Sequence, residues 1–220
     1  IAIYAIHTAF DNDFFGVNYG ICKALGLENR QILMPKTQAL QQLVVHVPLT
    51  HIEVVKEALF SAGAGHIGFY DQCSFSVSGQ GTFRPLDGSN PYSGKIGLRE
   101  QTEEVALSVI FESYKQFSIL QAAKTAHPYE EVAYQIYALE NENQYQGLGM
   151  FGELEEAMDE VDFMNFLKEK FELKLIRHSN LIGKKVRTIG VLGGSGASGI
   201  KKALSQKCDV YITGDVKYHD

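Results

Sequence analysis

The stretch VRTIGVLGGSGASGIKKALSQKCDVYITGD, residues 186–215, carries the clearest fold signal in the chain. Its two ends, Val186–Leu192 and Val210–Thr213, are rich in β-branched and apolar residues and are predicted to be strands. Ile200–Leu204, between them, is predicted to lie in a short helix. Alternating strands and helices are typical of an α/β fold. Ligands of open α/β sheets bind beyond the carboxyl ends of the strands, so a site is expected in the turns after these two strands.

The same alternation continues toward the start of the chain. Val161–Phe171 has apolar residues at helical spacing, and Leu173–Ile176 is predicted to be a strand. At the beginning, Ile1–Ile6 predicts a buried strand, and Val17–Leu27 predicts a helix with one apolar face. Glu140–Gly149 is polar and predicts a linker.

The middle of the chain has a different pattern. Strands are predicted at Leu43–Val47, Cys73–Val77, Glu104–Glu112 and Glu130–Leu139, and helices at His51–Ala62 and Phe117–Thr125. Strand, helix, strand, strand, helix, strand is the ferredoxin-like order of two β-α-β units. We therefore predict an α/β (α+β) chain in which a discontinuous α/β domain, residues 1–40 and 140–220, carries an inserted ferredoxin-like domain, residues 41–139.

Composition limits the classes of function. The 220 residues are 45% hydrophobic and 21% charged, as in ordinary globular proteins, which excludes disorder and coiled coil as the main architecture. The net charge of -6 argues against a general nucleic-acid binder. The sequence has no run of 18 apolar residues, so we expect no membrane span. Three widely spaced cysteines, Cys22, Cys73 and Cys208, favour a reducing, cytoplasmic compartment.

The glycine-rich turn after Val186–Leu192 is one candidate site. Gly194, Gly196 and Gly199 satisfy G-x-G-x-x-G, and Asp215 lies about 20 residues further on, where a ribose-binding carboxylate belongs. Glycine backbones let an anion approach the N–H groups at a helix start, and Ser195 adds a hydroxyl. A tight strand-to-helix turn selects the same residues, so both interpretations stay open. A P-loop is excluded because the turn does not end in Gly-Lys-Ser/Thr.

The motif His7-Thr8-x-x-Asp11 follows the first predicted strand and is a candidate metal site. An imidazole and a carboxylate four positions apart can face one ion if the loop curls back, and such mixed ligands suit Zn, Fe, Mn or Ni. The alternative is a structural loop in which Asp11 caps a helix or turn and His7 hydrogen-bonds the backbone.

Polar residues also crowd the end of Val210–Thr213. Asp215, Lys217 and His219 have side chains that bind anions or transfer protons. Asp215 can equally cap a helix that begins at Val216, and both roles can hold together.

His127-Pro128-Tyr129-Glu130-Glu131 has a structural explanation. Pro128 ends the preceding helix, and adjacent carboxylates on a strand point to opposite faces, which makes a poor acid/base pair.

Together these motifs resemble the Nif-three-like proteins, also called GTP cyclohydrolase I type 2 homologues. The resemblance covers nearly the whole chain and rests on four strings: Ala5–Asn12 (AIHTAFDN), Gly152–Leu154 (GEL), Gly193–Gly196 (GGSG) and Val210–Asp220 (VYITGDVKYHD). The middle of the chain resembles the PII/CutA-like insert of the longer members, through GAGHIG at 63–68, CSF at 73–75 and HPYEE at 127–131.

The resemblance implies a dinuclear centre of two divalent transition metal ions. It maps Asp11 onto the bridging aspartate and His7 onto a histidine that ligates a metal in some relatives. The family's His-His pair would precede Ile1, and its C-terminal His and Glu would follow Asp220, so we expect this chain to be a fragment with part of the centre. His219 belongs to the string before the real C-terminal ligand and is not assigned as one.

The resemblance also implies a function. We expect a metal-dependent hydrolase acting on a nucleotide-like or phosphate-bearing small molecule, with Thr8, the turn Gly194-Ser195-Gly196, Asp215, Lys217 and His219 around the substrate. A homo-oligomer, a hexamer in the family, is implied, with trimeric contacts through the insert. The alternative is a ligand-sensing regulatory protein that uses the PII-like insert without catalysis.

Overall fold

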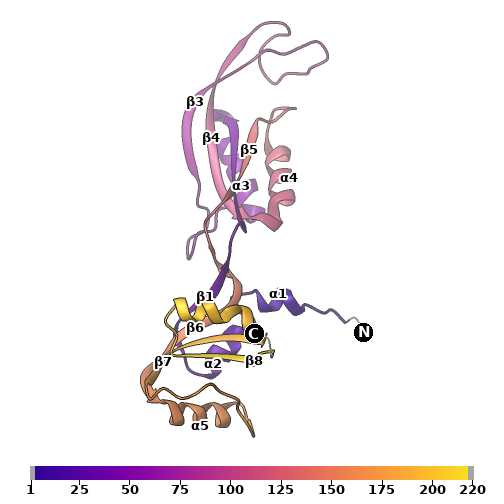
Figure 1. Cartoon of the computed structure of the whole chain (residues 1–220). Helices are drawn as coiled ribbons and strands as arrows, with labels where there is room; N and C mark the ends of the chain where they lie inside the picture. Colours follow the sequence, from indigo (N-terminus) through magenta and orange to yellow (C-terminus); the bar gives the residue numbers. More distant parts are fainter. Residues whose placement is uncertain (1–2, 218–220) are drawn as a thin grey trace. The chain divides into compact units, whose positions relative to one another are not determined.

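The chain forms two compact units, each with its own sheet and core (Figure 1). The computed structural model describes residues 3–217. Unit 1 combines the segment up to Lys36 with the segment from Asn143 onward, and unit 2 is Thr37–Glu142. The chain is therefore a mixed α/β protein with one unit discontinuous in sequence.

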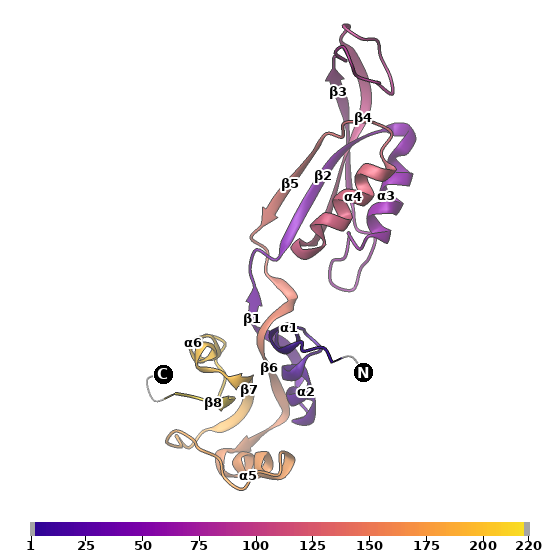
Figure 2. The same cartoon turned by 90° about the vertical axis from the view of Figure 1, so that its right-hand side faces the viewer.

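Unit 2 is a sheet with two helices on one face (Figure 2). Its elements are β2 (Leu40–Pro48), η1 (Leu49–His51), α3 (Ile52–Ser61), β3 (Phe75–Phe83), β4 (Glu100–Glu112), η2 (Ser113–Lys115), α4 (Gln116–Ala126) and β5 (Tyr134–Leu139). The strand order is β3-β4-β2-β5, and all neighbours are antiparallel.

The core of unit 2 follows from alternation along its strands. Leu43, Val45 and Val47 are fully buried, while their neighbours on β2 face the other way. Val55 and Leu59 of α3 pack against them. Burial of a side chain of this size contributes about 1.5–3 kcal/mol, so this face provides most of the driving force for folding unit 2.

Unit 1 is built around a sheet with the order β1-β6-β7-β8. Its elements are α1 (His7–Asp11), α2 (Val17–Ala24), β1 (Glu28–Lys36), β6 (Asn143–Asp159), α5 (Glu160–Lys170), β7 (Lys185–Ser195), η3 (Ala197–Gly199), α6 (Ile200–Ser205) and β8 (Val210–Asp215). β6 runs antiparallel to β1 and β7, whereas β7 and β8 are parallel and are joined by α6.

Helices cover both faces of the unit 1 sheet. α2 and α5 pack on one face, where Cys22 and Phe163 are fully buried against Ile189 of β7. Successive strand residues point to opposite faces, so Gly190 faces the other side, where Ala203 of α6 approaches it. The glycine gives α6 room to lie close to the strand.

The predicted strand at Ile1–Ile6 is wrong over its described part. Residues 3–6 have no regular structure, and Ile3 and Tyr4 are 93% and 87% exposed. β-propensity measures how well a side chain fits a half-buried pleated surface, and this segment has no such surface in unit 1. Leu173–Ile176 is likewise irregular rather than a strand: Ile176 packs against the core of unit 1, but Leu173 and Leu175 are 43% and 73% exposed.

The predicted linker at Glu140–Gly149 is also wrong. From Asn143 onward it belongs to β6, which pairs with β1, a strand that the apolar pattern did not reveal. The polar residues that suggested a linker fit because residues 143–149 pair with β1 on one side and bond to the backbone of residues 12–14 on the other. The other predicted elements exist, and β3 and β5 begin two and four residues later than predicted. No helix within residues 3–217 is long and apolar enough to cross a membrane.

Candidate functional site

His7 and Asp11 lie on a helix rather than a curled loop. They are the first and last residues of α1, so their spacing of four places both side chains on one face. His7 Nδ1 is 3.9 Å from Asp11 Oδ2. The His7 side chain is 92% exposed and that of Asp11 is 28% exposed, which leaves both donor atoms accessible. Thr8 is next to His7, and its hydroxyl is 3.4 Å from His7 Nδ1.

Backbone hydrogen bonds attach the end of α1 to the sheet. Gly147 N–H donates to the Asn12 carbonyl at 2.9 Å, and Phe14 N–H donates to the Tyr145 carbonyl at 3.1 Å. Gly16 completes this turn, because a Cβ there would clash with the carbonyl oxygen of Phe10. The helix is short, so its position depends on these contacts rather than on its own stability.

Asn18 connects this helix to the glycine turn. It lies in the first turn of α2 and is 2% exposed. Its Nδ2 donates to the carbonyl oxygen of Asp11 at 3.2 Å, and its Oδ1 accepts from Gly193 N–H at 2.8 Å. Leaving either backbone group buried without a partner would cost about 1–3 kcal/mol. Sequence reasoning missed Asn18, because no motif distinguishes it.

The glycine turn is held by hydroxyls of β8. Thr213 Oγ1 donates to the Gly194 carbonyl at 2.9 Å, and Tyr211 Oη donates to the Gly196 carbonyl at 2.6 Å. Burial raises the pKa of Tyr211 to about 12, so its hydroxyl remains a donor. Gly194 has φ +75°, and a Cβ on Gly196 would clash with Thr213, so both positions require glycine.

Asp215 lies beside this turn. It is the last residue of β8, pairs with Ser195 of β7, and its carbonyl accepts from Gly196 N–H at 3.3 Å. The predicted helix at Val216 is absent from residues 216–217, so the described part of the chain gives Asp215 no capping role. Lys217 follows two residues later, and His219 lies outside the described residues.

A metal ion would find two ligands here. Nδ1 of His7 and Oδ2 of Asp11 are separated by a distance that small side-chain rotations adjust to a shared ion. Among residues 3–217 there is no group of three or more His, Cys, Asp or Glu side chains placed to hold a metal. The pair therefore fits part of a metal centre.

His127 has the structural role that its motif predicts. It is 7% exposed, its Nε2–H donates to the His46 carbonyl at 2.8 Å, and its Nδ1 accepts from Tyr129 N–H at 3.1 Å. Burial lowers the pKa of His127, against the opposing effects of the His46 carbonyl and Glu104. Glu130 accepts from the Asn90 N–H, and neither Glu130 nor Glu131 lies in β5.

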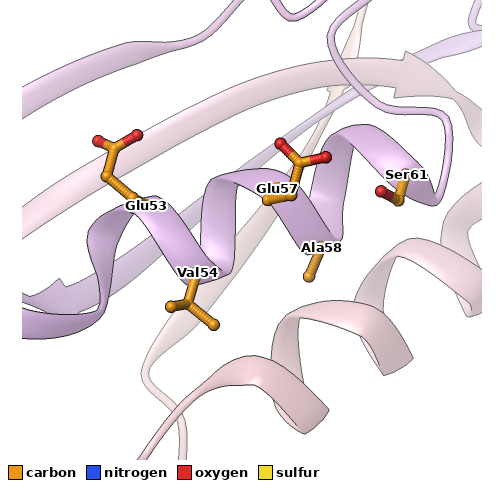
Figure 3. Close-up of a pocket in the computed structure, with 5 residues that line it drawn as sticks. All are labelled: Glu53, Val54, Glu57, Ala58 and Ser61. Atoms are coloured by element: carbon orange, nitrogen blue, oxygen red, sulfur yellow. The ribbon is translucent and has the colours of Figure 1, made fainter.

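Two shallow depressions lie on unit 2. The larger, about 560 Å³, runs along α3 between Glu53 and Ser61, with all of its lining residues from that one helix (Figure 3). The smaller, about 260 Å³, is lined by residues of α3 and of the following bend: Glu57, Phe60, Ser61, Ala64, His66, Asp71 and Gln72. Neither contains a residue of the His7–Asp11 site.

The three cysteines are free thiols. Burial raises the pKa of Cys22 to about 12 and that of Cys208 to about 11, so both stay protonated and are poor nucleophiles or ligands. Cys73 precedes β3 rather than beginning a strand as predicted, Cys208 precedes β8, and both are half-buried.

The fold and site define an α/β protein in which a discontinuous unit places a helix-borne His–Asp pair near a glycine turn. The model of the Duf34/NIF3 (NGG1p interacting factor 3) family matches residues 1–220, and the chain belongs to this family. This confirms the resemblance seen in its motifs.

Curated and solved relatives agree with this membership. The chain is 42% and 40% identical to proteins of Halalkalibacterium halodurans and Bacillus subtilis, each named "GTP cyclohydrolase 1 type 2 homolog". These matches cover all of this chain and 59% of each relative. The crystal structure of a Bacillus cereus protein related to NIF3 superposes with a TM-score of 0.82 at 42% identity, over 96% of this chain and 56% of that one.

Proposed function

We propose that the full-length protein is a dinuclear metal-binding hydrolase acting on a nucleotide-like or phosphate-bearing small molecule. The observation that carries the proposal is the accessible His7–Asp11 pair, 3.9 Å between Nδ1 and Oδ2, on a helix tied to the glycine turn. The family membership supports it. The chain spans 59% of the length of its curated relatives, and the proposal places the remaining ligands in the rest of the full-length protein.

In this proposal each residue has a defined task. Asp11 and His7 hold the metal centre, which supplies a nucleophilic water at neutral pH and stabilises developing negative charge. The turn Gly194-Ser195-Gly196, in which Gly196 N–H is already bonded to the Asp215 carbonyl, and the Lys217 ammonium orient an anionic substrate. Thr8 and Asp215 hydrogen-bond around it, and His219 is proposed as a further group at the substrate. Zn, Fe, Mn and Ni all suit this mixed ligand set.

The hydrolase proposal is tested with the full-length protein loaded in turn with Zn²⁺, Mn²⁺, Fe²⁺ and Ni²⁺. GTP, NAD and an acyclic phosphate ester are each offered, and products are followed by chromatography. GTP is the first compound to test because the curated relatives are named "GTP cyclohydrolase 1 type 2 homolog". We expect metal-dependent turnover of at least one compound, with a loss of about 100-fold or more in Asp11→Asn.

Asp13→Asn is the matched control for Asp11→Asn. It removes the same charge two residues away but keeps the Oδ1 that accepts from Phe15 N–H at 2.8 Å. It should leave turnover within a few-fold of wild type. Equal loss in both variants, or turnover that persists in a chelator, would contradict the proposal.

The alternative function is ligand sensing by unit 2 without catalysis. We propose unit 2 as a ferredoxin-like, PII/CutA-like domain, supported by its β-α-β-β-α-β order and the strand order β3-β4-β2-β5. Its smaller depression, with Glu57, His66 and Asp71, favours a polar ligand there. Nucleotide binding that is weakened by His66→Ala and unaffected by Asp11→Asn would favour this alternative.

We also propose that the protein assembles into a homo-oligomer, with a hexamer as the expected state. Support comes from large apolar side chains left exposed, such as Phe69 at 99% and Phe117 at 82%. Sedimentation velocity of the full-length protein tests this, and a monomer at micromolar concentration would contradict it.

We further propose a reducing, cytoplasmic location, which the free thiols of all three cysteines support.

A further inference from the structure

The Asn18 amide contacts two elements other than its own helix. The N-cap of α2 is Gly16, which has no side chain, so Asn18 is the first polar side chain of that helix. Asparagine commonly uses its amide to cap its own helix, but here both groups point away from α2. The orientation of the amide is fixed, because an N–H must face the Asp11 carbonyl and an oxygen must face Gly193 N–H.

Both partners of Asn18 are backbone groups. The Asp11 carbonyl lies at the last residue of α1, and Gly193 lies near the end of β7, as the first residue of the glycine turn. The spacing that Asn18 sets is therefore independent of the side chains at these two positions. Substituting the Asp11 side chain keeps both hydrogen bonds of Asn18, and substituting Asn18 removes no candidate ligand side chain.

The surroundings leave little freedom for the amide. A Cβ on Gly193 would lie 3.2 Å from Val17 Cγ1 and 3.7 Å from Asn18 Oδ1, so the absence of a side chain lets α2 approach β7 closely. The 2% exposure of Asn18 excludes water as a ready replacement partner. Two separate elements are thus connected through one buried group.

We propose that Asn18 is a positioning residue, which sets the distance between the His7–Asp11 pair on α1 and the glycine turn at Gly193–Gly196. This inference rests on the proposed function. It assigns to Asn18 the alignment of metal ligands with the backbone that faces an anionic substrate. Such outer partners commonly change metal affinity by 10–100-fold without touching the ion.

The test compares two alanine variants of the full-length protein. Asn18→Ala removes both connections. Asn12→Ala is the matched control, because the Asn12 amide donates to the Thr8 carbonyl at 2.8 Å within α1 itself. Zn²⁺ affinity is measured by chelator competition on folded protein. We expect a loss of about tenfold or more for Asn18→Ala and less than threefold for Asn12→Ala.

Asn18→Asp keeps the hydrogen bond to Gly193 N–H and removes the one to the Asp11 carbonyl. It also replaces Asn18→Ala in the test if that variant does not fold. A carboxylate still accepts from Gly193 N–H but faces the Asp11 carbonyl with an oxygen. Its added negative charge alone would strengthen cation binding, so a weaker affinity reports displaced geometry. Hydrogen exchange gives a second readout: we expect Gly193 N–H to exchange about tenfold faster in Asn18→Ala and at the wild-type rate in Asn18→Asp.

Crystal structures of wild type and Asn18→Asp provide a readout independent of any metal. We expect α1 to move relative to Gly193 by about 1 Å, beyond the tolerance of a preorganised site. An unmoved α1, or unchanged Zn²⁺ affinity in both Asn18 variants, overturns the positioning role. A failure of the proposed function gives another result. In that case Zn²⁺ affinity is the same in wild type and Asp11→Asn, whether or not α1 moves in the Asn18 variants.

Discussion

The two sheets of this protein differ in how regularly their strands pair. In unit 2, β2 pairs with β4 without interruption from Leu40 opposite Glu112 to Pro48 opposite Glu104. In unit 1 every pairing has a break in register, including one between Leu192 and Ser195 of β7. A continuous ladder satisfies the backbone by itself, whereas a broken one needs side chains to complete it.

The side chains that complete the irregular sheet also shape the candidate site. Asn18, Tyr211 and Thr213 each bond a backbone group at the glycine turn. In the regular unit such contacts are spread out: His127 bonds backbone groups of His46 and Tyr129, and Ser108 Oγ donates to the Phe75 carbonyl. In unit 1, three such side chains therefore gather at one register break, the one between β7 and β8.

The largest expected effect tests whether the two units are energetically separate. Phe163→Ala empties a fully buried position in unit 1 and should cost about 3–5 kcal/mol there. Hydrogen exchange should show faster opening of β6 and β7 and unchanged protection of β2 and β4.

The matching substitution in unit 2 is Leu107→Ala in β4. It should give the reverse exchange pattern and lower the stability of unit 2 by about 2–5 kcal/mol. Val161→Ala on α5, where Val161 is 58% exposed, should change stability by less than about 0.5 kcal/mol. Equal loss of protection in both units would contradict the separation.

Two glycine-to-alanine substitutions should give the next largest changes in the free energy of unfolding, and the two changes should have opposite signs. Gly16→Ala forces a Cβ against the Phe10 carbonyl and should cost about 1–3 kcal/mol. Gly20→Ala, in the same region, meets nothing within 4 Å and should stabilise α2 by about 0.5–1 kcal/mol. Urea unfolding measures both. Destabilisation by Gly20→Ala would mean that α2 is packed differently.

Acidification should destabilise unit 2 through His127. Its pKa is lowered in the folded state by burial, so the unfolded chain takes up the proton first. Stability is therefore full above about pH 7 and falls as the pH drops through the unfolded value of 6.5, by at most about 1.4 kcal/mol per pH unit. Protonating Nδ1 would also place a proton against Tyr129 N–H.

The control for this pH dependence is a second histidine variant. His127→Gln should flatten the acid limb of the stability curve of unit 2, and His178→Gln, at an exposed position, should leave it unchanged. The measurement is the free energy of unfolding in urea between pH 5 and 8, compared among wild type and the two variants. A wild-type curve that is flat through this range would contradict the buried neutral form of His127.

The smallest effect probes the glycine turn. Tyr211→Phe removes the hydroxyl that donates to the Gly196 carbonyl and should cost about 0.5–1.5 kcal/mol, because that carbonyl still accepts from Gly199 N–H at 2.9 Å. The ring and its packing remain. A cost below about 0.2 kcal/mol, measured by thermal unfolding, would show that the turn does not depend on β8.

The sequence predicted the regular unit better than the irregular one. The helices α3 and α4 and the strands β2 and β4 follow from apolar spacing, because each packs a single face on one core. No strand was predicted at β1 or anywhere in β6, since their polar residues are accommodated by pairing rather than by burial.

The candidate site, too, could be predicted from the sequence only in part. The motif at His7 and Asp11 and the glycine turn are visible in the sequence, but α1 was predicted as a loop. Asn18 is invisible to pattern analysis because its role depends on Gly193, 175 positions away. Contacts of this kind arise only when the chain is folded.

The most direct test of the account is anomalous diffraction from crystals of the full-length protein grown without chelator. Data above and below the metal absorption edges locate any bound transition metal. The account predicts a peak about 2.0–2.2 Å from an Asp11 carboxylate oxygen and about 2.0–2.1 Å from a His7 ring nitrogen, together with a second ion nearby. A metal-soaked crystal with no peak at Asp11, or with its metal bound elsewhere in the chain, would contradict a metal centre at His7 and Asp11.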